Sequence, residues 1–188
     1  MEILAIIPAR GGSKGIPRKN VRLLCGKPLV SYSINNAKNS KYITDVIVTT
    51  DDDEIKRISE LYKAEVIDRP SRLASDEVPL SPVIHHALNA IQLNRNIVYD
   101  IVIIMQPTSP LLKAGTLDDA IDHLVKNKLD SVISCVNRPH LAWTEYNGKY
   151  IPLYEKRVNR QYLPKYLLET GSFFISKTEF INEESSFG

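Results

Sequence analysis

Cysteine is nearly absent from this chain, because only Cys25 and Cys135 occur among its 188 residues. Two cysteines cannot build the disulfide framework of a small secreted domain, and neither of them stands in a metal-ligand spacing. We therefore expect both to be small buried apolar residues, in a protein of the reducing cytoplasm.

Long apolar runs and a one-sided charge are missing as well. The first apolar run, Ile3–Ile7, is far shorter than a membrane span or the core of a signal peptide. The formal net charge is only +2, without the strongly basic balance of a non-specific nucleic-acid binder. The composition therefore predicts neither a membrane nor a nucleic-acid partner, and any cationic site must be local. The length suits one domain, residues 1–188, with its own core.

Apolar runs of strand length alternate along the chain with helical patterns. The expected strands are Ile3–Ile7, Val46–Thr50, Glu65–Ile67, Ile101–Met105 and Ser131–Val136. The expected helices are Leu29–Ala37, Asp53–Lys63, Pro82–Gln92 and Thr116–Lys126. Ile- and Val-rich strands without strict alternation are typical of a buried parallel sheet, so the pattern predicts a three-layer α/β domain. The loops that follow its strands, residues 8–20, 49–53 and 106–110, should meet at one edge of the sheet.

The alternation breaks down after Val136. Residues 137–164 carry prolines, aromatic residues and mixed charge, with a hairpin signal at Asn147-Gly148, and we expect them to protrude from the domain. A last strand is expected at Gly171–Ser176, followed by the start of a helix within Lys177–Glu184.

Glycines and cations share the loop that follows the first strand. Glycine lets backbone N–H groups turn toward an anion, and cations this close together repel one another unless they share an anion. The spacing fits neither a P-loop nor a dinucleotide-binding fold. The loop predicts a site for a nucleoside triphosphate, and a solvated basic turn is the less favoured alternative. The residues concerned are Gly11, Gly12, Gly15, Arg10, Lys14, Arg18 and Lys19.

The segment Ile-Pro-Ala-Arg-Gly-Gly-Ser-Lys-Gly-Ile-Pro-Arg-Lys-Asn, residues 7–20, resembles the signature of CMP-sialic acid synthetases, the N-acylneuraminate cytidylyltransferases. Relatives that act on legionaminic or pseudaminic acid share most of this pattern, whereas the cytidylyltransferases of KDO share only its beginning. Further motifs resemble the family in its order, over nearly all of the chain. They lie at residues 26–29, 48–52, 69–76, 106–111, 160–164 and 171–175.

The resemblance implies a Rossmann-like nucleotidyltransferase fold with a mostly parallel sheet. It also implies that the anomeric hydroxyl of a nine-carbon 2-keto sugar acid attacks the α-phosphate of CTP and releases pyrophosphate. Such a displacement needs positioning and positive charge, for which we choose Lys19 at the α-phosphate and Arg10 at the outer phosphates as catalytic residues. Arg69 is expected at the cytosine, with a surface ion pair as the alternative. The full set of expected nucleotide-binding residues is Ala9, Arg10, Gly11, Ser13, Lys14, Lys19, Asn20, Arg69 and Ser81.

The sugar acid is expected to bind at Gln106, which directly follows a buried strand and offers both a donor and an acceptor. The alternative is an amide that caps the turn at residues 107–110. Arg160 and Gln161 resemble acceptor-binding residues of the family. Phe174 would wall the sugar site, and ordinary core packing is an equal alternative.

The chemistry of CTP calls for Mg²⁺, which neutralises the phosphates. Members of the family carry an Asp-x-Asp pair near their end that is thought to hold the metal, and the end of this sequence has no counterpart of it, so we expect an incomplete chain whose metal ligands lie beyond Gly188. Asp51 is the one acidic substitute at the sheet edge, and a helix N-cap is its alternative role. We expect a homodimer formed through residues 137–164. The other functions left open are transfer to another acceptor, such as KDO, and a non-catalytic nucleotide-binding module.

Overall fold

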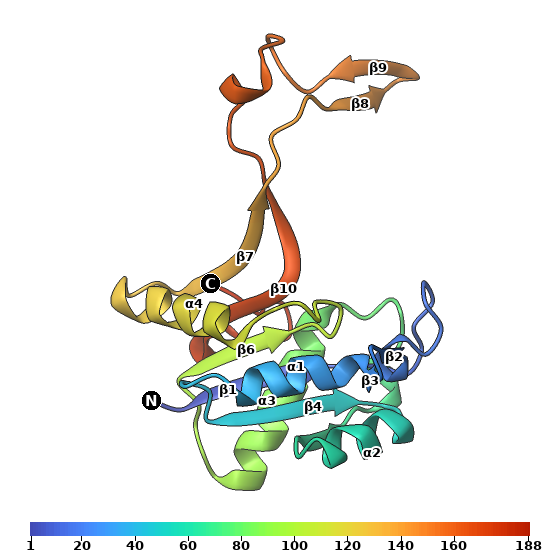
Figure 1. Ribbon diagram of the computed structural model, residues 1–188, viewed down its shortest axis with the longest axis vertical. Coiled ribbons are helices and arrows are strands. Elements are labelled where there is room, and N and C mark those ends of the chain that lie inside the picture. The colour runs from blue at the N-terminus through green and yellow to red at the C-terminus, as the bar shows by residue number, and fades with distance from the viewer. The chain divides into compact units, whose positions relative to one another are not determined.

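The computed structural model describes residues 1–188, which form two compact units (Figure 1). The main unit comprises Met1–Ile133 and Gly171–Gly188, and the small unit comprises Ser134–Thr170. The segment that was expected to leave the domain, residues 137–164, falls inside the small unit.

A six-stranded sheet has the strand order β5-β4-β1-β6-β10-β7. β1 pairs in parallel with β4 and with β6, β4 pairs in parallel with β5, and β10 runs antiparallel to β6. The sheet is therefore mostly parallel, which confirms the predicted fold class. Its strands are β1 Ile3–Pro8, β4 Asp45–Thr50, β5 Glu65–Asp68, β6 Ile101–Met105, β7 Ser131–Asn137 and β10 Leu167–Lys177.

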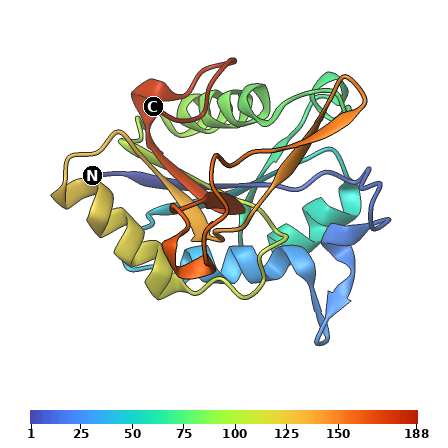
Figure 2. The same ribbon diagram turned by 90° about the horizontal axis from the view of Figure 1, so that it is seen from above.

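Helices cover both faces of the sheet, as the three layers in Figure 2 show. Successive residues of β1 point to opposite faces. Ile3, Ala5 and Ile7 pack with residues of α1, α2 and α4, whereas Leu4 and Ile6 pack with α3. None of the helices combines the length and the apolar character that crossing a bilayer requires. Their bounds are α1 Leu29–Lys38, α2 Asp53–Leu61, α3 Leu80–Arg95 and α4 Ala114–Lys126.

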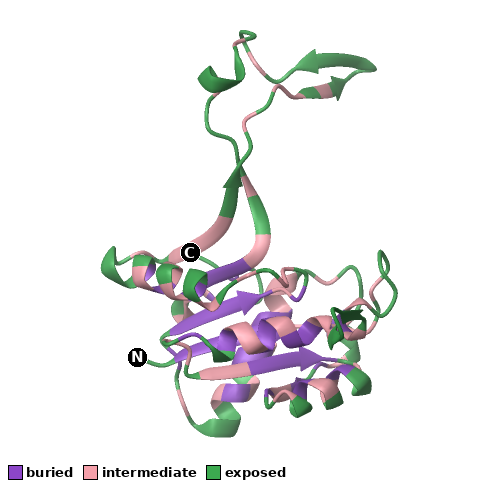
Figure 3. Cartoon of the chain, in the orientation of Figure 1, coloured by how far each residue is buried: buried purple, intermediate pink, exposed green.

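The most deeply buried strands are β1 and β6, in the middle of the sheet (Figure 3). β7 was expected to be a buried strand, but it lies at the edge of the sheet and none of its residues is buried. Cys135 is exposed for this reason. Cys25 is exposed too, because it occupies the two-residue turn between β2, Leu23–Leu24, and β3, Lys27–Pro28. The expectation that both cysteines are buried was therefore wrong.

The helix expected within Lys177–Glu184 does not form. A single 3-10 turn, η4 Thr178–Phe180, ends at Ile181, whose backbone is extended. The Asn182 side chain then accepts hydrogen bonds from the backbone N–H groups of Glu184 and Ser185, both at 2.8 Å. An asparagine that binds the backbone in this way competes with helix formation, which explains why the helix pattern stops.

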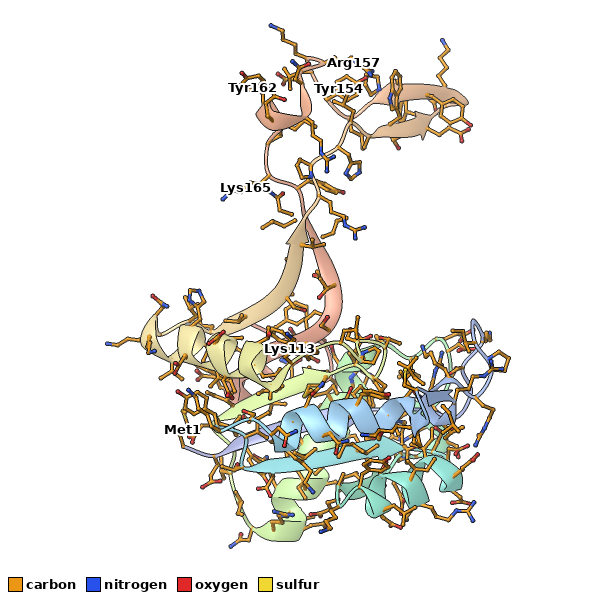
Figure 4. All side chains as sticks on the ribbon, in the orientation of Figure 1. Met1, Lys113, Tyr154, Arg157, Tyr162 and Lys165 are labelled. Carbon is orange, nitrogen blue, oxygen red and sulfur yellow. The ribbon has the colours of Figure 1, made fainter.

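The small unit contains the predicted hairpin. β8 Trp143–Tyr146 pairs antiparallel with β9 Lys149–Pro152, and Asn147 and Gly148 in the turn have φ values of 51° and 71°. These left-handed conformations are those of a type I′ turn. Tyr154 follows the hairpin and is labelled in Figure 4. Trp143 meets it edge to face at a centroid distance of 5.9 Å.

Candidate active site

A cavity of about 560 Å³ opens where the chain leaves β1 and β6. Its wall also includes residues of the segment 69–79, which joins β5 to α3, and Leu80 and Val83 in the first turn of α3. A cavity of this size falls in the range of small-molecule sites. The residues in its wall that the sequence analysis singles out are Arg10, Ser13, Lys14, Gly15, Lys19, Asn20, Arg69 and Gln106.

The start of the first loop packs against the sheet and α2. The N–H group of Ala9 donates to the Thr49 carbonyl at 3.0 Å, and the N–H group of Gly11 donates to Asp51 Oδ1 at 3.0 Å. A Cβ atom on Gly11 would lie 2.6 Å from Asp52 Oδ2, closer than real Cβ contacts allow. Gly11 is therefore required here by the close approach of Asp52, and neither Ala9 nor Gly11 is part of the cavity wall.

Arg18 connects the same loop to helix α2 and is not part of the cavity wall. Its guanidinium forms ion pairs with Asp52 and Glu54, while its backbone is left-handed with a φ of 58°. We had counted Arg18 among the charges that face a polyphosphate, and this expectation was wrong. The carboxylates at the start of α2 bind Arg18 instead, so its charge is already neutralised.

Asp52, not Asp51, is the N-cap of α2. Its side chain accepts hydrogen bonds from the N–H groups of Glu54 and Ile55, both at 3.0 Å. The hydrogen bond from Arg18, together with these backbone donors, holds the pKa of Asp52 below its usual value. Asp51 accepts the N–H group of Gly11. Together with the ion pairs of Arg18 to Asp52 and Glu54, this bond joins the loop to the start of α2 at three points.

Lys19 and Asn20 follow in a 3-10 turn, η1 Lys19–Val21. Asn20 is buried, and its Nδ2 donates to the Arg10 carbonyl at 3.0 Å, which ties together the two ends of the loop. Lys19 lines the cavity and forms no salt bridge with any residue the structure describes. Its ammonium group is therefore the uncompensated positive charge of the loop.

The other two cations that the first loop contributes to the cavity wall share one carboxylate. Arg10 Nη2 lies 2.5 Å from Asp76 Oδ1, and Lys14 Nζ lies 2.5 Å from Asp76 Oδ2. Both ion pairs lower the pKa of Asp76, the bond from Lys14 having the largest effect. Sequence reasoning assigned no role to Asp76. The signal available was its place in the Leu-Ala-Ser-Asp motif, but nothing in a sequence pairs it with the loop.

Arg69 is buried in the cavity wall, with only 8% of its surface exposed. Its Nη2 donates to the Thr49 carbonyl at 2.8 Å, while its Nε has no hydrogen-bond partner. Burial lowers its pKa to about 10, and the nearby Asp51 opposes this shift. The alternative of a surface ion pair is thus excluded. An unpaired buried donor is costly, so the Nε group is a site of unmet hydrogen bonding in the wall of the cavity.

Gln106 stands at the end of β6. The turn that follows is closed by the backbone, because the N–H group of Ser109 donates to the Gln106 carbonyl at 3.3 Å. The side-chain amide is not needed as a cap, which removes that alternative. Gly171 has a φ of 67°, and its Cβ position lies 3.7 Å from both terminal atoms of Gln106. The Gln106 amide therefore packs against Gly171 in β10, where the chain re-enters the main unit.

Besides Ala9 and Gly11, four expected site residues lie outside this cavity wall. Ser81 is the second residue of α3 and does not line the cavity. Phe174 belongs to the core and stacks on Phe187 at a centroid distance of 6.0 Å, as the packing alternative requires. Arg160 and Gln161 are exposed in the 3-10 turn η3 Arg160–Tyr162 of the small unit.

The residues the structure describes do not form a metal site. No group of three or more His, Cys, Asp or Glu side chains is arranged so that it could hold an ion. Asp51 accepts the Gly11 N–H group, and Asp52 is occupied by Arg18 and by the backbone of α2. The acidic residues at this edge thus support the loop and do not fit a Mg²⁺ site.

The family model of the cytidylyltransferases matches residues 4–147. A pseudaminic acid cytidylyltransferase of Campylobacter jejuni is 40% identical over 129 residues, covering 68% of this chain and 55% of that protein. A CMP-N,N'-diacetyllegionaminic acid synthase of Legionella pneumophila is 40% identical over 138 residues, covering 71% and 57%. An N-acylneuraminate cytidylyltransferase of Escherichia coli is 31% identical over 194 residues, covering 100% and 45%. The chain thus spans about half the length of these relatives.

Solved structures share the fold. A CMP:2-keto-3-deoxy-manno-octonic acid synthetase complexed with CTP matches with a TM-score of 0.71 and 17% identity, covering 95% of this chain and 75% of that chain. A 4-diphosphocytidyl-2C-methyl-D-erythritol synthase from Anaerococcus prevotii matches with a TM-score of 0.63 and 17% identity, covering 96% and 72%.

Proposed function

Because this chain belongs to the cytidylyltransferase family, we propose that it transfers CMP from CTP to the anomeric hydroxyl of a nonulosonic acid and releases pyrophosphate. The family membership gives the type of reaction, and the names of the relatives suggest the class of acceptor. The observation that carries the proposal is the cavity in which Arg10, Lys14 and Lys19 of one loop meet the buried Arg69.

In the proposed reaction, the anomeric oxygen forms a bond to the α-phosphorus and the bond to the bridging oxygen of the β-phosphate breaks. Pyrophosphate leaves with that electron pair, and the hydroxyl proton passes to water. Negative charge grows on the phosphate oxygens during this exchange, so fixed positive charge at the site lowers the barrier. Lys19 is proposed for the α-phosphate because no carboxylate compensates its charge. Arg10 and Lys14 are proposed for the outer phosphates.

Other residues of the same cavity wall are proposed to bind the base, the nucleotide and the sugar acid. Arg69 is proposed to bind the cytosine O2, supported by its place in the cavity wall, where its Nη2 is anchored on the Thr49 carbonyl. Ser13 is proposed as a hydroxyl donor to the nucleotide, and Asn20 as the residue that keeps the loop closed around it. Gln106 is proposed to bind the sugar acid with its free amide. Arg160 and Gln161 are proposed acceptor ligands on grounds of family resemblance.

A metal requirement, a cellular compartment and an oligomeric state also belong to the proposed function. The reaction is expected to require Mg²⁺, to which we assign no ligand in this chain. The protein is expected to act in the cytoplasm. It is also expected to form a homodimer through the small unit, which the exposed side chains of Trp143, Tyr146 and Tyr150 support.

The test is release of pyrophosphate from CTP and Mg²⁺ with a panel of sialic, legionaminic, pseudaminic and KDO-type acids. Lys19→Ala should lower kcat by about a hundredfold or more, in line with the loss of one charged group at a reacting centre. The control is Lys27→Ala, which removes an exposed lysine of β3 outside the cavity. Release with KDO alone would favour the alternative acceptor.

The second candidate function is a non-catalytic nucleotide-binding module, which the lack of a metal-binding group in residues 1–188 favours. It predicts that CTP binds and that no acid of the panel gives pyrophosphate. Equal non-zero rates for the wild-type protein and Lys19→Ala would contradict the catalytic role of this lysine, and equal affinities for CTP would contradict its role in a binding module.

A further inference from the structure

Asp76 forms ion pairs with Arg10 and Lys14, the two cations that the proposed function assigns to the outer phosphates. Each of its carboxylate oxygens lies 2.5 Å from one of them, Oδ1 from Arg10 and Oδ2 from Lys14. All three side chains belong to the wall of the same cavity. Asp76 comes from the segment between the 3-10 turn η2 Ser71–Leu73 and α3, whereas both cations come from the first loop. A phosphate that enters this cavity therefore meets these cations already bound to an anion.

The Asp76 carboxylate is charged at the neutral pH at which a nucleotide would bind. Lys14 and Arg10 hold the pKa of Asp76 below its usual value, so it remains ionised at neutral pH. A carboxylate presents one negative charge to the pair, whereas pyrophosphate and the outer phosphates of a nucleotide present several. The larger charge wins the competition for the two cations, because each cation gains more from it. A single phosphate group has a smaller advantage.

We propose that Asp76 is an internal counter-anion for Arg10 and Lys14, which the outer phosphates displace on binding and which returns when pyrophosphate leaves. This inference rests on the proposed function. It makes Asp76 a determinant of specificity for polyphosphates and an aid to product release. Its exchange leaves Lys19 untouched, because Asp76 forms no contact with that residue. A role as a mere support for the two cations predicts the opposite effect of removing the charge, namely weaker binding of polyphosphate.

The experiment is calorimetric titration of the purified chain with inorganic pyrophosphate. Asp76→Asn removes the charge at nearly constant volume and should tighten binding by about threefold or more, since two partly exposed ion pairs no longer compete. The matched control is Glu77→Gln, which removes the same charge at the next position, where the side chain forms no ion pair. The control should bind pyrophosphate within about twofold of the wild-type protein, because Glu77 is exposed outside the cavity wall and solvent and salt screen its charge.

Asp76→Ala serves as the second variant, and thermal melts of all variants check that the fold is kept. Binding to Asp76→Asn that is equal to or weaker than wild-type binding would overturn the inference. So would equal tightening in Glu77→Gln, or an absence of pyrophosphate binding in both the wild-type protein and Asp76→Asn. Pyrophosphate binding needs neither acceptor nor turnover, so failure of the CMP-transfer assay with this tightening intact would overturn the proposed function and leave the role of Asp76 standing.

Discussion

Gly11→Ala tests whether the cationic loop depends on its contact with helix α2. The added Cβ atom would lie 2.6 Å from Asp52 Oδ2 and 3.0 Å from Asp52 Cβ. Rotation of the short Asp52 side chain can relieve the first contact but not the second, because its Cβ is fixed to the backbone. The variant must therefore shift either the loop or the first turn of α2, and the Asp52 carboxylate loses its present position.

The loss of unfolding free energy in Gly11→Ala can be worked out from the bonds that Asp52 makes. Losing its N-cap hydrogen bonds to Glu54 and Ile55 costs about 1 kcal/mol of unfolding free energy. Its ion pair with the half-exposed Arg18 adds about 0.2 to 1 kcal/mol after solvent screening. The sum of about 1 to 2 kcal/mol corresponds to a fall in Tm of about 2 to 8 °C for a chain of this length.

The control is Gly12→Ala, because an added Cβ atom at Gly12 has no neighbour within 4 Å. Neither glycine has a left-handed φ, so both variants restrict the unfolded chain to a similar degree. The difference between their melting temperatures, measured by circular dichroism at pH 7, isolates the contact with Asp52. A Tm for Gly11→Ala equal to or above that of Gly12→Ala would refute the reasoning.

Two further predictions concern Asp52 and Arg69. The folded pKa of Asp52 is lowered, so its carboxylate stabilises the fold above its unfolded pKa of about 3.9, and this contribution is lost as the pH falls through the folded pKa. Asp52→Asn keeps a good N-cap and should flatten the loss of Tm below about pH 4, whereas an acid transition like that of the wild-type protein would contradict the role of its charge. Arg69→Lys removes the unpartnered Nε and the hydrogen bond to Thr49, and should weaken CTP binding by about tenfold while leaving pyrophosphate binding unchanged. Equal weakening of both ligands, measured by calorimetry, would argue against a contact with the base.

The sequence was a good guide wherever a property is local. Residues 3–7 and 101–105 are unbroken apolar runs, and they became the buried strands β1 and β6. Residues 131–136 have a similar composition, yet β7 lies at the edge of the sheet, because burial depends on the order of strands, which no single run contains. Local chemistry also stopped the helix expected after Lys177, through the Asn182 side chain.

The candidate site likewise has features that the sequence shows and features that depend on the fold. The clustering of cations in one loop was visible in the sequence, and Lys14 and Lys19 do line the cavity. The role of Arg18 was not visible, because it depends on a left-handed backbone and on carboxylates about 35 positions away that face it only in the folded chain. Asp76 was hidden for the same reason. Sequence reasoning thus found the charges but not their partners.

The contact of Gly11 and Arg18 with Asp52 has a consequence for how this chain can diverge. Because the contact includes the Cβ atom of Asp52, a larger side chain at position 11 fits only with glycine at position 52 or with a shifted loop, and loss of the Asp52 carboxylate removes a partner of Arg18. We therefore expect single substitutions at these positions to be disfavoured relative to combined ones. Among homologous sequences the three positions should covary, although none of them touches the ligand cavity.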